Sequence, residues 1–75
     1  MYEVKLVKID TEKEVLGNLD GQGFYPYKKV STVVNKLYER MKHLPKHYKT
    51  GYRYEIYHGS DWLHTDRLAM VLPIK

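Results

Sequence analysis

Residues 30–44 read VSTVVNKLYERMKHL, and this stretch decides the fold. Its apolar residues recur at helical spacing, at positions i, i+3, i+4, i+7, i+11 and i+14: Val30, Val33, Val34, Leu37, Met41 and Leu44. The pattern predicts an amphipathic helix with one buried face about 100° wide. Ser31 is the predicted N-cap, because its hydroxyl can accept from the free N–H groups of the first turn, and Pro45 is predicted to end the helix.

Strand patterns flank this helix on both sides. Residues 2–9 mix β-forming with charged residues, and a turn at 10–13 precedes a short second run at 14–16. A glycine-rich irregular connection is expected from there to Lys29. After the helix, residues 51–58 alternate, and residues 67–72 form a closing strand next to Pro73.

The element order β(β)αββ predicts an α+β fold. We expect residues 1–75 to form one domain, a small antiparallel sheet of three to four strands with one amphipathic helix on one face. The uncovered face is predicted to be rich in tyrosine and either partly exposed or used in self-association, which leaves a homodimer open. In the closing strand, alternation places four apolar residues on one face: Leu68, Met70, Leu72 and Ile74.

Length and composition restrict the class of function. A chain of 75 residues without cysteine has neither disulfides nor thiolate metal sites, and it has little volume for a sequestered active site. We therefore expect a binding protein without catalytic activity or cofactor. The first ten residues, MYEVKLVKID, show no hydrophobic run of the kind found in signal peptides, and no window approaches the roughly 18 apolar residues of a membrane span. The expected location is cytoplasmic, with no membrane partner.

The charge is concentrated in the middle of the chain. Residues 1–20 carry three lysines and five acidic residues, a net charge of −2. Residues 21–54 carry eight basic residues and only Glu39 as an acid, a net charge of +7. Residues 55–75 carry two bases and three acids, which brings the whole chain to +4. A central basic segment of this kind favours an anionic partner.

Aromatic residues interleave with these bases between Lys42 and Tyr54. Cations neutralise phosphates with release of counterions, and aromatic rings stack on unpaired bases, so the mixture is typical of nucleic-acid binding. The predicted phosphate contacts are Lys28, Lys29, Lys36, Arg40, Lys46, Lys49 and Arg53. The aromatic residues predicted to stack or pack beside them are Tyr48, Tyr52 and Tyr54. The alternative is a set of solvated lysines and ordinary β-forming tyrosines.

A second hypothesis is a small protein-binding or inhibitory module with an acidic protein as its partner. Large aromatic side chains dominate many protein interfaces, and an exposed sheet edge offers a second means of contact. The candidate residues are Trp62, Phe24, Tyr25 and Tyr27. Packing of these rings in the core is the competing interpretation.

Two further patterns carry little weight. The glycine-rich residues 17–23 lack the Gly-Lys-Ser/Thr ending of a P-loop, so turn formation explains them. The polar residues of the later turn resemble a hydrolytic or metal cluster: His58, Asp61, His64 and Asp66. The pair His43 and His47 is interrupted by Pro45, and ligands need convergent geometry, so no metal site is predicted.

Overall fold

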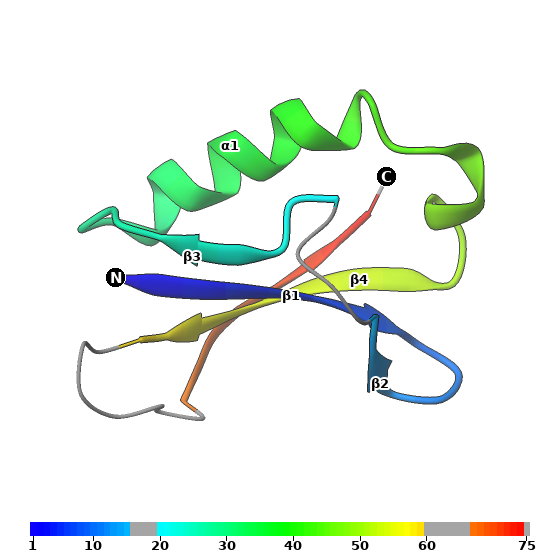
Figure 1. Cartoon of the computed structure of the whole chain (residues 1–75), viewed down its shortest axis with the longest axis horizontal. Helices are drawn as coiled ribbons and strands as arrows, with labels where there is room; N and C mark the ends of the chain where they lie inside the picture. The colour runs from blue at the N-terminus through cyan, green and yellow to red at the C-terminus, as the bar shows by residue number, and fades with distance from the viewer. Residues whose placement is uncertain (16–19, 60–66, 75) are drawn as a thin grey trace.

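The fold is an antiparallel sheet with a helix across one face, as a computed structural model of the chain shows (Figure 1). The structure describes residues 1–15, 20–59 and 67–74. Its elements are β1 (Tyr2–Lys8), β2 (Lys13–Glu14), β3 (Gly23–Tyr25), α1 (Val30–Met41), the 3₁₀ turn η1 (Lys46–Tyr48), β4 (Tyr52–His58) and β5 (Leu68–Pro73). The predicted α+β class is confirmed, with five strands in place of the expected three to four.

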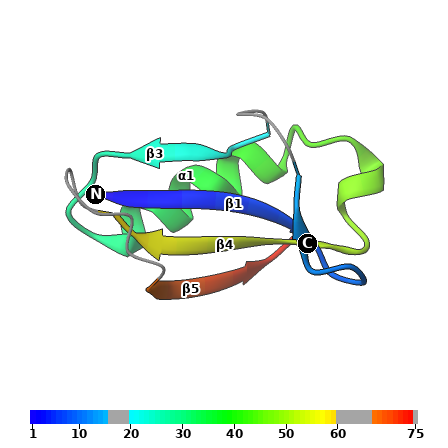
Figure 2. The same cartoon turned by 60° about the horizontal axis from the view of Figure 1, so that its bottom comes forward.

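Strand β1 lies inside the sheet, between β4 on one side and the short strands β2 and β3 on the other (Figure 2). β3 pairs with residues 2–4 of β1 and β2 with residues 7–8, which leaves Lys5 and Leu6 between them. There the Leu6 N–H donates to Oε1 of Gln22 at 3.1 Å, and the Leu6 carbonyl accepts from the Val15 N–H at 2.7 Å. A side chain and a loop amide therefore complete the hydrogen bonding of β1 where no strand does.

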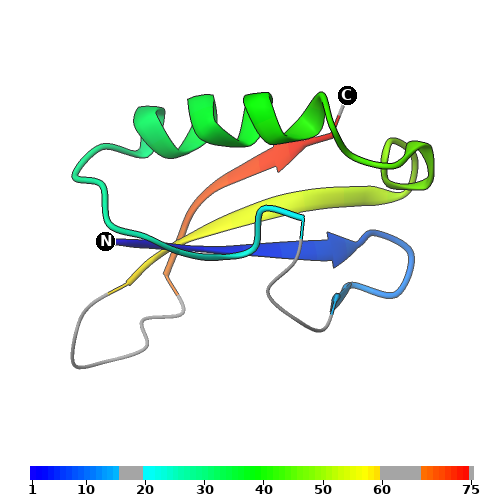
Figure 3. The same cartoon turned by 45° about the horizontal axis from the view of Figure 1, so that its top comes forward.

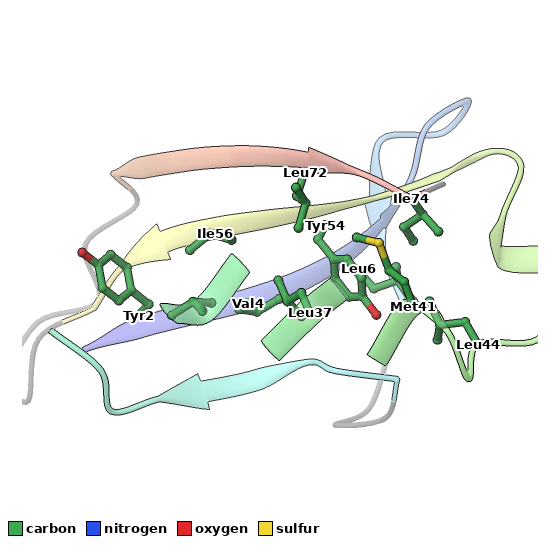
Figure 4. Packing of buried hydrophobic residues seen from close by; sticks show 11 residues of the cluster. Tyr2, Val4, Leu6, Leu37, Met41, Leu44, Tyr54, Ile56, Leu72 and Ile74 are labelled. Carbon is green, nitrogen blue, oxygen red and sulfur yellow. The ribbon is translucent and has the colours of Figure 1, made fainter. Parts of the chain in front are cut away.

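The core lies between α1 and the covered face of the sheet (Figures 3 and 4). The predicted helical stripe is confirmed, with Val33, Leu37 and Met41 buried on the inner side of α1. The sheet contributes buried side chains from its three longest strands: Tyr2, Val4, Leu6, Tyr54, Ile56 and Leu72. Full burial of one such side chain stabilises the fold by about 1.5–3 kcal/mol. The apolar contacts between α1 and the sheet are therefore the main source of stability in this two-layer core.

Both predicted ends of the helix are wrong. The N-cap is Lys29, which makes no capping side-chain hydrogen bond, so Ser31 lies already within the helix. The helix ends at Met41, before Pro45. Beyond it, the His43 N–H donates to the Arg40 carbonyl at 3.0 Å, an i to i+3 bond of the tighter kind that often ends helices. This tightened turn keeps Leu44 buried although it lies outside α1.

Two elements of the first half differ from expectation. The second strand covers Lys13–Glu14, earlier than the predicted 14–16, of which residue 16 lies outside the described part of the chain. β3 lies within the stretch expected to be an irregular connection. Three residues that include a glycine show no alternation, so only pairing with β1 identifies this strand.

The prediction of a tyrosine-rich uncovered face is also wrong. Tyr52 and Tyr54 point toward α1, and the uncovered face, termed here the open face, carries Arg53, Glu55 and Tyr57 from β4. In β5, a register shift opposite Ile56 and Tyr57 pairs Leu68 with Tyr57. This β-bulge places Leu68 on the open face, so it does not share a face with Leu72 as simple alternation predicted.

The turn at residues 20–21 packs tightly beneath the helix. Asp20 and Gly21 both have positive φ, at 60° and 95°. A Cβ atom on Gly21 would lie 2.9 Å from the Tyr54 hydroxyl and 3.2 Å from Leu37 Cδ2. Glycine is needed here both for its backbone conformation and for space.

We predict that Gly21→Ala lowers the free energy of unfolding by about 2–5 kcal/mol, from left-handed strain and overpacking together. Gly51→Ala is the matched control, because Gly51 also has a positive φ, 84°, but no atom lies within 4 Å of its added Cβ. The control should lose only about 1–2 kcal/mol of strain. Urea unfolding of both variants measures the difference, and equal losses would contradict the tight packing of the turn.

Candidate nucleic-acid interface

Four of the predicted cations lie on or just before α1, and all four are exposed. Lys28 and Lys29 precede its first residue, while Lys36 and Arg40 follow one turn apart and therefore share a flank of the helix. The first turn of α1 contains no acidic residue. The one acidic residue of the whole helix, Glu39, accepts a hydrogen bond from Lys42 Nζ at 3.2 Å and is thus compensated locally. The net charge of this flank is positive.

Two more cations extend the series beyond the end of the helix. Lys46 and Lys49 are exposed at η1, where the chain turns from α1 toward β4 (Figure 1). Three rings of this region pack on one another, with centroid distances of 4.1 Å between His47 and Tyr48 and 4.9 Å between Tyr48 and Tyr52. This aromatic packing attaches η1 to the core and fixes where its lysines stand.

Asp20 is a second acidic group beside this series. Its Oδ1 lies 3.9 Å from Nη2 of Arg40. Hydrogen bonding to the Asp20 carboxylate is also the main cause that raises the pKa of Tyr48. Arg40 is therefore partly compensated, whereas no ion pair among the described residues engages the five lysines of this series, Lys28, Lys29, Lys36, Lys46 and Lys49.

These observations define one surface, which we call the helix-side basic surface. It comprises Lys28, Lys29, Lys36, Arg40, Lys46 and Lys49. It runs from the start of α1 to η1, and Tyr48 and Tyr52 support its far end from below. Six of the seven predicted phosphate contacts thus lie along one side of the molecule.

Arg53 and Tyr54 do not belong to this surface, which corrects their predicted grouping. Arg53 lies on the open face, where its Nη2 is 2.7 Å from Oε2 of Glu55. Tyr54 is fully buried, so its ring packs in the core and cannot stack on a base. Burial is the main cause that raises the pKa of Tyr54, and its hydroxyl donates to the Asp20 carbonyl.

The open face carries a charge network that the sequence reasoning missed. Lys5 Nζ lies 3.5 Å from Oε2 of Glu14 and 5.1 Å from the centroid of the Tyr57 ring. Glu55 accepts hydrogen bonds from Arg53 and from the Tyr57 hydroxyl. Burial tends to raise the pKa of Glu55, but these hydrogen bonds outweigh it and hold the pKa below its usual value. The alternation of β4 already places its charged residues on one face, which was the available signal.

The aromatic residues of the protein-binding hypothesis do not form one patch. Phe24 is 56% exposed and pairs with Glu3, so it lies on the open face. Tyr25 and Tyr27 pack against the core on the covered side, and the Tyr25 hydroxyl donates to the Gly21 carbonyl at 2.6 Å. Trp62 lies outside the described residues.

Among the described residues, no three histidine, aspartate or glutamate side chains gather in a way that would hold a metal ion. Asp61, His64 and Asp66 lie outside that part of the chain, and so do residues 17–19 of the glycine-rich stretch. None of the described helices is long and apolar enough to span a membrane. No protein-family model matches the chain, and neither curated proteins nor solved structures show a significant match to it.

The lowered pKa of Glu55 predicts a pH-dependent contribution to stability. Its ionised form is stabilised in the folded state, so the contribution is full above the ordinary glutamate pKa and disappears as pH falls through the lowered value. We expect Glu55→Gln to lower the free energy of unfolding by about 1–3 kcal/mol at neutral pH and to have little effect in strong acid. Glu12→Gln, at an exposed position, is the control and should change stability by less than about 0.5 kcal/mol. Urea unfolding at several pH values measures both, and a loss for Glu55→Gln that does not vary with pH would contradict the assignment.

Proposed function

We propose that this chain is a small, non-catalytic nucleic-acid-binding protein of the cytoplasm that contacts phosphates through the helix-side basic surface. The observation that carries the proposal is the series of exposed lysines without ion-pair partners among the described residues: Lys28 and Lys29 just before α1, Lys36 on it, and Lys46 and Lys49 at η1. Phosphate contacts need such exposed cations, because their energy comes largely from the release of condensed counterions.

The length of the surface supports the same role. A helix of 12 residues is about 18 Å long, which corresponds to about five phosphates of one strand at 3.4 Å each. The cations at η1 extend the surface past the end of α1. The surface is therefore long enough to follow a nucleic-acid backbone over about half a helical turn.

The aromatic residues favour binding that does not depend on base sequence. Tyr48 and Tyr52 are engaged edge-to-face with each other and partly buried, so they support the lysines of η1 in place of offering free rings. Lysine and arginine contacts to phosphate position a protein on nucleic acid but do not read its sequence. We expect similar affinity for oligonucleotides of different sequence.

An acidic protein is the second candidate partner. The exposed ring of Phe24 favours it, because such a large apolar side chain on a sheet face is typical of a protein contact. The two candidates use different surfaces, since Phe24 lies on the open face and the lysines lie beside α1. Phe24→Ala should leave oligonucleotide affinity unchanged if nucleic acid is the partner.

We predict that binding of a labelled oligonucleotide weakens steeply with salt. With about five phosphate contacts, the logarithm of the association constant should fall with the logarithm of salt concentration with a slope of about −3.5 for a single strand and about −4.5 for a duplex. Fluorescence anisotropy over a range of salt concentrations measures the slope. No binding at low salt, or an affinity that does not respond to salt, would refute the proposed function.

Charge reversal tests the location of the surface. The double variant Lys36→Glu/Lys46→Glu should weaken oligonucleotide binding at least tenfold and make the salt slope shallower by about 2. The matched control Lys13→Glu/Arg67→Glu changes the net charge equally, at exposed residues in β2 and just before β5 that lie outside the surface. A control that loses as much affinity as the first variant would show that net charge alone, without this surface, accounts for binding.

A further inference from the structure

β5 forms an edge of the sheet without any charge. It pairs with β4 on one side, and no described strand lies on its other side (Figure 2). Residues 68–74 read LAMVLPI, and the side chains of Leu68, Met70 and Val71 are 48%, 38% and 41% exposed. Edge strands of proteins are commonly protected by charges or by being very short. The opposite edge consists of two very short strands, β2 with two residues, Lys13 and Glu14, and β3 with three.

The backbone of β5 is open for pairing at Val71. Leu6 of β1 directs its N–H and carbonyl toward Gln22 and Val15, away from β4. Its partner Tyr54 therefore directs its own backbone groups toward β5, where it pairs with Leu72. Since alternate residues of a strand point to opposite sides, the N–H and carbonyl of Val71 project outward from the edge. None of the described residues bonds to them.

We propose that this edge binds a second copy of the chain, with β5 pairing antiparallel to β5 of the other copy about a two-fold axis at Val71. In this register the two Val71 residues exchange both of their N–H to carbonyl bonds, and Met70 packs beside Leu72 of the second copy. Pro73 lies opposite Ala69 of the second copy. Because proline has no N–H, it limits the paired segment to about five residues.

The charges favour a second copy at this edge. The chain carries +4 overall, so approach of two copies along the helix-side basic surface is opposed by repulsion. Glu55 of β4 is the register partner of Val71, and its side chain on the open face is already paired with Arg53. Within the paired residues 69–73, two copies therefore meet without bringing unbalanced charge together. A short strand contact of this kind belongs to the weak, concentration-dependent class of interfaces.

The dimer leaves the proposed nucleic-acid surface accessible. A two-fold axis perpendicular to the sheet keeps both helices on the same face of one continuous sheet. On α1, Tyr38 lies about 160° around the helix axis from Arg40, whose flank faces Asp20 and the β1 edge. The flank with Tyr38 thus faces β5, and the basic flank turns away from the axis. The inference is independent of the proposed function, because dimerisation is measured without nucleic acid.

Sedimentation velocity of the full chain over a hundredfold range of concentration tests the proposal. The average mass should rise from 9.0 kDa toward twice that value and not beyond it. Val71→Lys places two like charges on the axis and should weaken dimerisation at least tenfold. Val71→Pro removes the outward-facing donor and should weaken it similarly without adding charge.

Phe24→Lys is the matched control, because it adds the same charge at an exposed apolar residue on the opposite edge of the sheet. The control should dimerise like the wild type, and far-UV circular dichroism confirms that each variant is folded. A wild-type average mass that stays at 9.0 kDa over the whole concentration range would overturn the proposal. A strand of another protein would then be the remaining candidate partner of this edge. Growth beyond a dimer, or equal behaviour of the Val71 variants and the control, would overturn it as well.

Discussion

The hydrogen bond from the buried Tyr54 hydroxyl to the Asp20 carbonyl is the interaction on which the arrangement of the other elements depends. A tyrosine at the centre of a core needs a partner for its hydroxyl, since an unpaired buried group costs about 1–3 kcal/mol. The partner is available only because the chain turns beneath α1 with positive φ at Asp20 and Gly21. That turn in turn places Gln22 against Leu6, so the same contact completes the edge of β1.

The turn also connects the core to the candidate interface. The carboxylate of Asp20 meets Arg40 on the flank of α1 and Tyr48 in η1, so one residue links both halves of the helix-side basic surface. The carbonyl of the same residue accepts from the core tyrosine. A shift of this turn would therefore change the core packing and the spacing of the surface cations together. The position of the turn at residues 20–21 thus determines the geometry of the surface.

Periodicity predicted the helix, β4 and the fold class, because apolar spacing reports directly on which positions are buried. It could not predict which face of the sheet the helix covers. Tyrosine is at once a β-former and a large apolar ring, so an alternation of Tyr52 and Tyr54 with Arg53 is compatible with either orientation. The position of Leu68 depends on a β-bulge, and β3 on pairing with a distant strand. Neither leaves a local signal.

The same limit explains which of the candidate site residues lie on one flank of the structure and which do not. Lys36 and Arg40 share a flank because helical geometry fixes residues four apart, whereas Arg53 was grouped by nearness in sequence although strand alternation turns it away from Tyr52. The contact of Asp20 with Arg40 spans the whole connection into α1 and has no local signature. Charge is consequently separated by face: positive beside the helix, balanced on the open face, and absent along β5. A chain of 75 residues with a single core has few surfaces, and this separation would let the two proposed partners, nucleic acid and a second copy, bind without mutual repulsion.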